Sequence, residues 1–169
     1  PALAALLGKP ARGDWTLRVA DLARSDIGRL NGWALALELR VPAAGPTELA
    51  LDDTPGLTIP DAAAAGIERA LRVDAEGPVR RVEVAVDITH PWIGDLTVDL
   101  LSPAGTVAPL HARAGGSADN LIVRYADTAA LRALAGETAA GDWRLRVVDH
   151  ARADVGKLNR WSLKLVVGG

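Results

Sequence analysis

Three side chains of this sequence have the types found in a serine hydrolase: Asp87, His90 and Ser117. A serine nucleophile, a histidine base and an aspartate that orients the histidine together cleave acyl bonds. The serine, however, is not in a Gly-x-Ser-x-Gly elbow, and Asp87 is too near His90 in sequence to indicate a triad. We therefore predict no catalytic residues in this chain, and we expect His90, which precedes Pro91, to bond local backbone groups at a strand end.

Three residues offer side-chain oxygens to a metal ion: Asp119, Asn120 and Asp127, which follow a Gly-rich segment. Calcium takes six to eight oxygen ligands from such groups, so these three are calcium candidates. Asp95, after Gly94, is expected instead to accept backbone N–H groups across a turn. The sequence has no His/Cys pattern for zinc and no glycine-rich loop leading into a helix for phosphate.

Aromatic side chains are the remaining candidates for ligand contact. Trp143 and Trp161 would form a sugar-stacking platform if exposed, but both fall in the apolar register of expected strands, which favours core packing. Trp92, between Pro91 and Ile93, is the residue we expect to be exposed and available for binding.

The composition excludes several classes of function. The chain has 169 residues, 49% hydrophobic and 24% charged, and a formal net charge of -2, so no basic surface for nucleic acid is expected. No apolar run is long enough to span a bilayer, and no cysteine is present for disulfide or thiolate chemistry. Because the sequence starts with Pro1 and contains no methionine, we expect it to be part of a longer protein with no leader of its own.

An internal repeat organises the chain. Residues 3–38 align without gaps to residues 131–166, and 21 of the 36 aligned positions are identical. The offset of 128 residues suits a domain plus a linker better than a solenoid unit. We therefore predict that 1–42 is the C-terminal part of one domain, 43–58 a linker rich in Pro and Gly, and 59–169 a complete second domain.

The hydropathy pattern indicates strands. Apolar residues alternate with polar ones in 80–88, 96–100, 143–147 and 161–165, which is the period of a half-buried strand. Turn residues separate these runs, and only 128–134 is expected to form a short helix. Many short strands joined by turns predict an all-β sandwich or jelly roll.

Several motifs occur in a recognisable order: IPDAAAAG at 59–66, DITHPWIGDL at 87–96, SPAGT at 102–106, and the repeated GDWxLRVxD and GxLNxW. Together they resemble the P domain, or homo B domain, of kexin- and furin-like proprotein convertases and of bacterial secreted subtilisin-like proteases. The resemblance implies an all-β jelly-roll β-sandwich over about 59–167, with 1–42 as the end of a preceding copy. It implies structural rather than catalytic roles for His90, Gly94, Asp95, Ser102, Pro103, Gly105, Trp143 and Trp161.

Two functions follow from the resemblance. One is a noncatalytic accessory domain of a secreted bacterial protease, which packs against an adjacent subtilisin-like catalytic domain and stabilises or regulates it, with calcium as the cofactor that some relatives use. The other is a tandem binding or adhesion module for a protein or polysaccharide surface, which gains avidity by repetition. Residues 1–42 hold two expected strands without their sheet partners, so we also expect a homodimer through this segment.

Overall fold

The computed structural model describes residues 3, 6–23, 27–39 and 45–168. The chain divides into two units, Pro1–Ala43 and Ala44–Gly169. The described residues of the first unit contain no strand, and most of their large apolar side chains are exposed. None of the helices within the described ranges is long and apolar enough to cross a membrane.

The second unit is an antiparallel β-sandwich, which confirms the predicted fold class. Alternating apolar side chains form strands because the pleat sends every second residue to the same face. The strands are β1 (Thr47–Asp53), β2 (Leu57–Ile59), β3 (Ile67–Val73), β4 (Val79–Thr89), β5 (Leu96–Leu101), β6 (Val107–Ala112), β7 (Leu121–Ala126), β8 (Gly141–Asp149) and β9 (Gly156–Val167).

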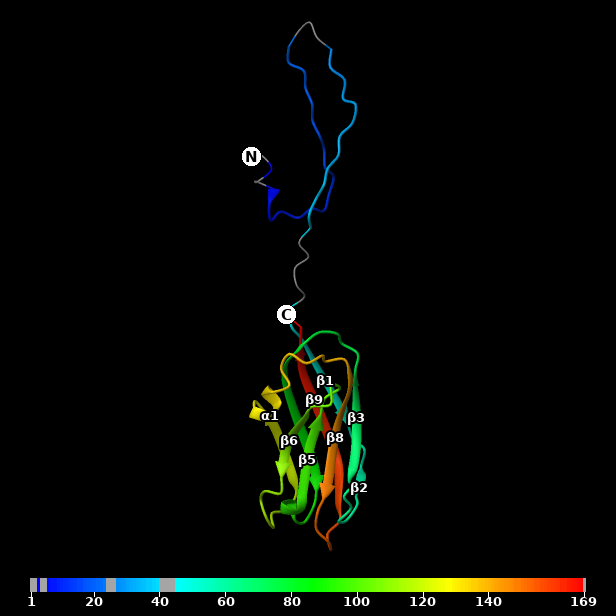
Figure 1. Ribbon diagram of the computed structural model, residues 1–169, viewed down its shortest axis with the longest axis vertical. Coiled ribbons are helices and arrows are strands. Elements are labelled where there is room, and N and C mark those ends of the chain that lie inside the picture. The colour runs from blue at the N-terminus through cyan, green and yellow to red at the C-terminus, as the bar shows by residue number, and fades with distance from the viewer. Residues whose placement is uncertain (1–2, 4–5, 24–26, 40–44, 169) are drawn as a thin grey trace. The chain divides into compact units, whose positions relative to one another are not determined.

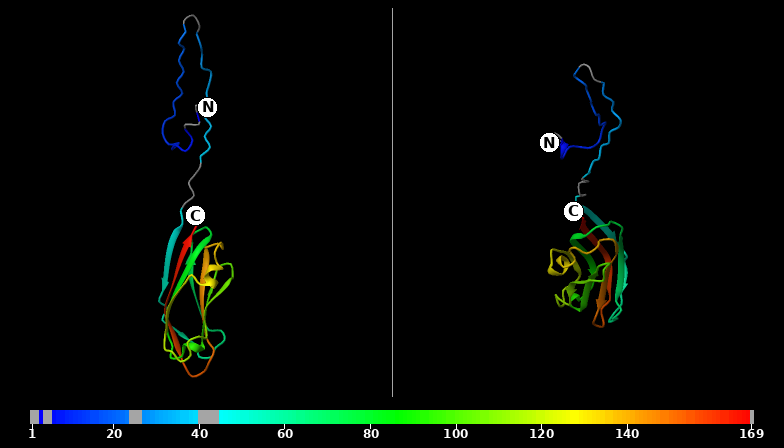
Figure 2. Two further views of the ribbon diagram at one scale, coloured as in Figure 1. Left: turned by 90° about the vertical axis from the view of Figure 1, so that its left-hand side faces the viewer. Right: turned by 45° about the horizontal axis from the view of Figure 1, so that its top comes forward.

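Two sheets form the layers of the sandwich (Figures 1 and 2). One has the strand order β1-β9-β4-β7, and β2 pairs with the other end of β9. The second has the order β3-β8-β5-β6. Every strand pair is antiparallel. Strands that are far apart in sequence meet at the centre of each sheet, β9 with β4 and β8 with β5.

The core lies between the two sheets. Trp143 of β8 and Trp161 of β9 are both 0% exposed, and the apolar residues of β4 and β5 surround them. Each indole also reaches a polar partner, because Trp143 Nε1 donates to the Ala139 carbonyl at 2.9 Å and Trp161 Nε1 to Asp53 Oδ2 at 3.3 Å. Burial with a satisfied N–H is the usual state of tryptophan in a core.

The expected linker over 43–58 is wrong in extent, because strand β1 and the first residues of β2 lie within it. β1 pairs with β9 from Thr47↔Val167 to Asp53↔Trp161, and Figure 1 shows the two strands side by side. Leu49 and Leu51 pack on the core, while Ala50 between them is exposed. This alternation is only seven residues long, and the prolines and glycines on both sides of it concealed the strand.

The one expected helix is present and short. α1 (Ala129–Arg132) begins after Thr128, whose side chain accepts a hydrogen bond from the Leu131 backbone at 3.2 Å. Leu131 and Leu134 are both buried, so this turn closes one side of the sandwich beside β4 and β6.

Candidate functional site

His90 directly follows β4, and both of its imidazole nitrogens are engaged. Nδ1 accepts a hydrogen bond from the Trp92 backbone N–H at 3.1 Å, and Nε2 lies 3.2 Å from Asp149 Oδ2. Because Nδ1 is an acceptor, the ring proton is on Nε2 and is donated to the carboxylate. His90 is 0% exposed and Asp149 is 1% exposed.

Further contacts of His90 join four strand ends. The His90 N–H donates to Asn120 Oδ1 at 3.2 Å, and the Asn120 N–H donates to the His90 carbonyl at 2.8 Å. The other oxygen of Asp149 accepts the Ala151 N–H at 3.1 Å. A Cβ on Gly156 would lie 2.5 Å from His90 Cδ2, so only glycine fits there. We call His90, Asn120, Asp149 and Gly156 the histidine cluster.

The geometry excludes a triad of Ser117, His90 and Asp87. Both nitrogens of His90 are used inside the sandwich, so neither can take a proton from a serine. Asp87 accepts a hydrogen bond from Asn159 Nδ2 at 2.9 Å, and Ser117 is an exposed loop residue. Within the described chain, the histidine cluster therefore has a structural role: its hydrogen bonds hold the ends of neighbouring strands together.

The corner after the histidine cluster is fixed by backbone contacts. The short 3₁₀ helix η2 (Ile93–Asp95) is joined to the loop before β7, because the Gly94 N–H donates to the Gly116 carbonyl at 2.9 Å. A Cβ on Gly94 would lie 2.8 Å from Gly116 Cα. The Asp95 carbonyl accepts the His150 N–H at 2.9 Å, but its carboxylate accepts no hydrogen bond from the described residues, contrary to expectation.

Trp92 projects from this rigid corner. Its side chain is 45% exposed although its backbone N–H is tied to His90. Val155, in the turn between β8 and β9, is also exposed, and the Asp95–His150 bond joins this turn region to the corner. An anchored aromatic ring with a free face is the type of residue that protein interfaces use most.

The SPAGT motif forms a tight turn between β5 and β6. Ser102 is 0% exposed, and its Oγ accepts the Thr106 N–H at 3.2 Å. Gly105 has a φ of +90°, which favours glycine. Pro103 packs against Gly141, where a Cβ would lie 2.6 Å from the proline Cβ. These contacts position the β5–β6 turn against the start of β8.

The residues expected to bind calcium do not gather at one place. Asp119 and Asn120 precede β7, whereas Asp127 follows it, so a strand of six residues, about 20 Å long, separates them. Asn120 Oδ1 already accepts the His90 N–H. In the described residues, no group of three or more His, Cys, Asp or Glu side chains could hold a metal ion. The predicted three-residue calcium site is therefore wrong.

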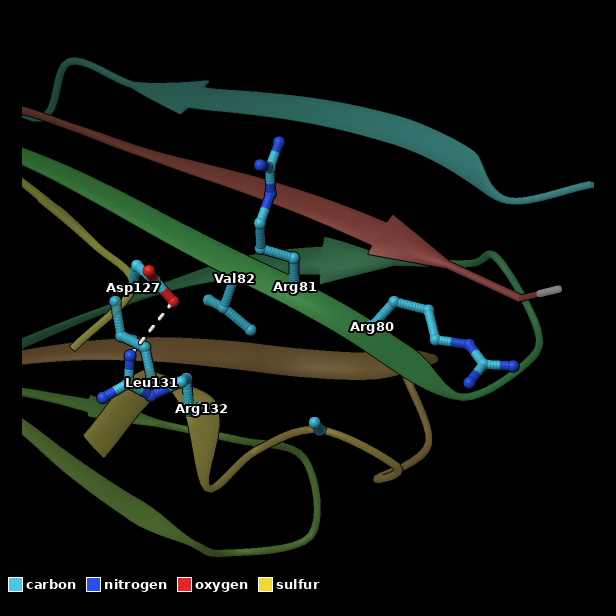
Figure 3. Close-up of a pocket in the computed structure, with 7 residues that line it drawn as sticks. Arg80, Arg81, Val82, Asp127, Leu131 and Arg132 are labelled. Carbon is cyan, nitrogen blue, oxygen red and sulfur yellow. Dashed lines mark hydrogen bonds and ion pairs between the residues drawn. The ribbon is translucent and has the colours of Figure 1, made fainter. Parts of the chain in front are cut away.

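Asp127 has a different partner. It lines a shallow pocket between β4 and α1, where its carboxylate pairs with Arg132 Nη1 at 3.3 Å (Figure 3). Figure 3 shows Asp127 turned toward Arg132, while the guanidinium groups of Arg80 and Arg81 point elsewhere. The pocket is lined by Arg80, Arg81, Val82, Asp127, Leu131, Arg132 and Ala135.

Two groups of the β4–β7 pair, Glu83 and Tyr125, have shifted pKa values. A hydrogen bond from Arg124 lowers the pKa of the Glu83 carboxyl. Burial raises the pKa of the Tyr125 hydroxyl to about 12, because the charged phenolate is poorly solvated there. Neither group contacts the histidine cluster, so both shifts belong to the sandwich rather than to a reactive centre.

Sequence reasoning missed the partners of His90. Asp149 is the buried partner of His90, although no motif or spacing around it indicated such a role. The repeat held the signal, because Asp149 and Gly156 recur as Asp21 and Gly28 in the first unit.

The chain belongs to the proprotein convertase P-domain family, which confirms the resemblance. The family model matches residues 2–37 and 79–165, which together exceed half of the chain. The first of these segments lies in the first unit and the second lies in the sandwich.

Similar proteins include a bacterial leupeptin-inactivating enzyme and several bacterial proteases. The leupeptin-inactivating enzyme 1 of Streptomyces exfoliatus is 38% identical over 139 residues, which cover 79% of this chain and 30% of that protein. The calcium-dependent protease of Trichormus variabilis is 38% identical over 146 residues, covering 82% of this chain and 21% of that protein. The chain thus spans less than a third of the length of these relatives.

Solved structures show the same fold. The serine protease of Aeromonas sobria, in complex with its chaperone, matches with a TM-score of 0.62 at 22% identity, over 77% of this chain and 28% of that chain. At 22% identity this match shows a shared fold and gives no evidence of a shared function.

Proposed function

We propose that the sandwich is a noncatalytic accessory module of a secreted bacterial protease, and that it packs against the catalytic domain and stabilises or regulates it. The proposal depends on one observation: the imidazole of His90, the residue closest in type to a catalytic base, is bonded inside a P-domain sandwich. Several relatives of this chain are named as proteases. The catalytic domain is proposed to be subtilisin-like, although one relative is named a metalloprotease, that of Streptomyces mobaraensis.

We place the contact with the catalytic domain at the Trp92 corner. Gly94 and the histidine cluster fix this corner, so an interface formed there would lose little conformational freedom. Trp92 and Val155 supply exposed apolar surface at this end. Interfaces between domains of one chain bury about 600 to 1,500 Å². A few exposed apolar side chains as large as Trp92 can anchor an interface of this area.

The experiment compares Trp92→Ala with Val107→Ala in the longest protease polypeptide that contains this chain. Val107 is a matched control, because it is 53% exposed but starts β6, beside Leu101 at the far end of β5 from η2. We expect Trp92→Ala to reduce the yield of active secreted protease and to shorten its half-life on heating. Equal behaviour of the two variants would remove the corner from the proposal.

The second candidate function is a tandem binding module for a polysaccharide or protein surface, favoured by the same exposed Trp92. A polysaccharide pull-down with the isolated chain tests it. Retention that is lost in Trp92→Ala and kept in Val107→Ala would support this binding function, and no retention would leave the accessory module as the better account.

Two relatives are named calcium-dependent proteases, one from Trichormus variabilis and one from a Nostoc strain, and these names raise the question of a calcium requirement. We propose that a calcium requirement of the parent protease resides outside residues 44–169. The support is the separation of Asp119 and Asn120 from Asp127 along β7. The melting temperature of this chain is expected to be the same in calcium and in a calcium chelator, and a rise in calcium that Asp119→Asn abolishes would contradict this.

We propose further that residues 1–42 are the C-terminal part of a preceding P-domain repeat. The domain that follows it begins near residue 44 and not at residue 59 as the sequence predicted. The family match over 2–37 and the identity to 131–166 support this assignment. Secretion is proposed from the name of the Aeromonas sobria relative, an extracellular serine protease.

A further inference from the structure

The two copies of the repeat share local geometry as well as sequence. Trp15 Nε1 donates to the Ala11 carbonyl at 3.0 Å, as Trp143 Nε1 does to Ala139 at 2.9 Å. The Ala23 N–H donates to an Asp21 oxygen, as the N–H of Ala151 does to Asp149. Glycines with positive φ also recur, at +75° and +124° for Gly8 and Gly13 and at +90° and +130° for Gly136 and Gly141.

The apolar side chains of the first copy are the same residues that form the core in the second copy. In the second copy they are fully buried, whereas in the first copy most of them are exposed; for example, Trp33 is 53% exposed and Trp161 is 0% exposed. The identical pairs are Leu17 and Leu145, Val19 and Val147, Leu30 and Leu158, Trp33 and Trp161, Leu35 and Leu163, and Leu37 and Leu165.

Three polar contacts between 131–167 and the rest of the sandwich use residues that are also duplicated. Asp149 bonds His90, Asn159 bonds Asp87, and Trp161 bonds Asp53. The first copy has Asp21, Asn31 and Trp33 at these positions. Gly28 likewise repeats Gly156, which His90 requires to be glycine.

The connection to β1 permits the first copy to enter the same sheet. Thr47, the first residue of β1, pairs with Val167, the last residue of β9. Leu39 is the counterpart of Val167, and residues 40–46 separate it from Thr47. Seven residues suffice for a loop between neighbouring antiparallel strands, whose Cα atoms are about 5 Å apart.

We propose that residues 3–39 and 131–167 are interchangeable partners of strands β1 to β7 in this one chain. When 3–39 occupies the sheets, it leads directly into β1 and forms a circularly permuted sandwich, and 131–167 is released. This inference rests on the assignment of 1–42 to a repeat, but it does not depend on any role in a protease.

Differences between the copies make 131–167 the favoured occupant. Arg160 pairs with Asp52 at 2.5 Å and Arg144 with Glu68 at 3.1 Å, whereas the first copy has glycine and threonine at these positions. Val148, which is buried, is alanine in the first copy. The permuted form is therefore the minor state until the second copy is damaged.

The test places a charge in the core of either copy of the full chain. Trp161→Asp disables β9, and we expect this variant to keep a cooperative thermal transition, with a lowered midpoint, because 3–39 takes over. Trp33→Asp alone should melt like the unmodified chain, and Trp33→Asp combined with Trp161→Asp should lose the transition. Circular dichroism follows all three variants, and gel filtration with light scattering should find Trp161→Asp monomeric.

A cysteine pair checks the register, since the chain has no cysteine of its own. Ala50 pairs with Lys164, whose counterpart in the first copy is Ala36. In the Trp161→Asp background, Ala36→Cys with Ala50→Cys should form a disulfide readily. Ala36→Cys with Asp52→Cys, two residues out of register, should oxidise more slowly.

Three results would overturn the proposal. The first is loss of the transition in Trp161→Asp, equal to that of the double variant. The second is a double variant that folds as well as Trp161→Asp, because the first copy would then be irrelevant. The third is a Trp161→Asp dimer, which would replace exchange within one chain by the homodimer through residues 1–42 that the sequence suggests. Failure of any protease assay would leave these folding results unchanged.

Discussion

A histidine beside an aspartate is not evidence of catalysis when both are committed to the core. His90 donates one proton to Asp149, and Asp149 accepts a second hydrogen bond from the Ala151 N–H. Two donors therefore converge on one carboxylate. Such a site requires a residue with two acceptor oxygens and no donor, and aspartate satisfies it.

This requirement predicts that Asp149→Asn destabilises the chain, and that Asp149→Ala, which leaves both donors without an acceptor, destabilises it further. An amide has one acceptor and one donor, so it leaves one buried N–H unsatisfied, at a cost of about 1 to 3 kcal/mol in the free energy of unfolding. Asp142→Asn is the control, because Asp142 is an exposed residue of the same strand. Urea denaturation measures all three variants, and an Asp149→Asn variant as stable as the control would refute the account.

Tyr125 gives a second prediction for a single residue. It is the only tyrosine, and burial raises its pKa to about 12 from the ordinary value of 10.0. The ultraviolet absorbance of tyrosinate should therefore titrate near pH 12 in the folded chain and near pH 10 in urea.

The sign of the effect on stability follows from the same shift. The neutral hydroxyl is favoured in the folded chain, so the stability linked to Tyr125 is fully present below pH 10 and is lost as the pH rises through about 12. A titration midpoint near pH 10 in the folded chain would show that the side chain is solvated.

At the scale of elements, the short strand β1 stabilises the long strand β9 by pairing with one of its edges. It covers one edge of β9 and contributes Asp53, which accepts hydrogen bonds from Arg69 and Trp161. Without β1 and the first residues of β2, much of this edge of β9 would lose its backbone partners and be open to pairing with other chains.

We therefore expect residues 59–169 to be less stable than residues 44–169. Loss of the partly buried Leu49 and Leu51 alone should cost about 2 kcal/mol. Thermal unfolding of the two fragments checks this, with light scattering to detect association. Equal melting temperatures would mean that β1 is dispensable, as the expected linker implied.

Strands could be predicted from sequence where the alternation was long, as in β4 and β9, but not where seven residues stood between prolines, as in β1. The histidine cluster could not be predicted from spacing. His90 and Asp149 are 59 residues apart in sequence, and they meet because β4 and β8 end at the same side of the sandwich in different sheets. Local pattern determines a strand, whereas topology determines which strand ends meet.

At the scale of the whole molecule, the two ends of the sandwich differ. One end carries the histidine cluster and the exposed Trp92, whereas the other is where the sandwich begins and ends, at Thr47 and Val167. A partner at the Trp92 end would thus contact the module away from its covalent connections. This arrangement suits both proposed functions, because each requires a free surface on a tethered domain.

The pairing of Thr47 with Val167 also determines how the module would respond to force. A pull through the flanking chain would act on the paired ends of β1 and β9 and open their hydrogen bonds one after another, as a zipper opens, instead of shearing all of them at once. The sandwich should therefore yield at low tension, however stable it is to heat. In a protein anchored at both ends, it would serve as an extensible joint rather than as a rigid strut.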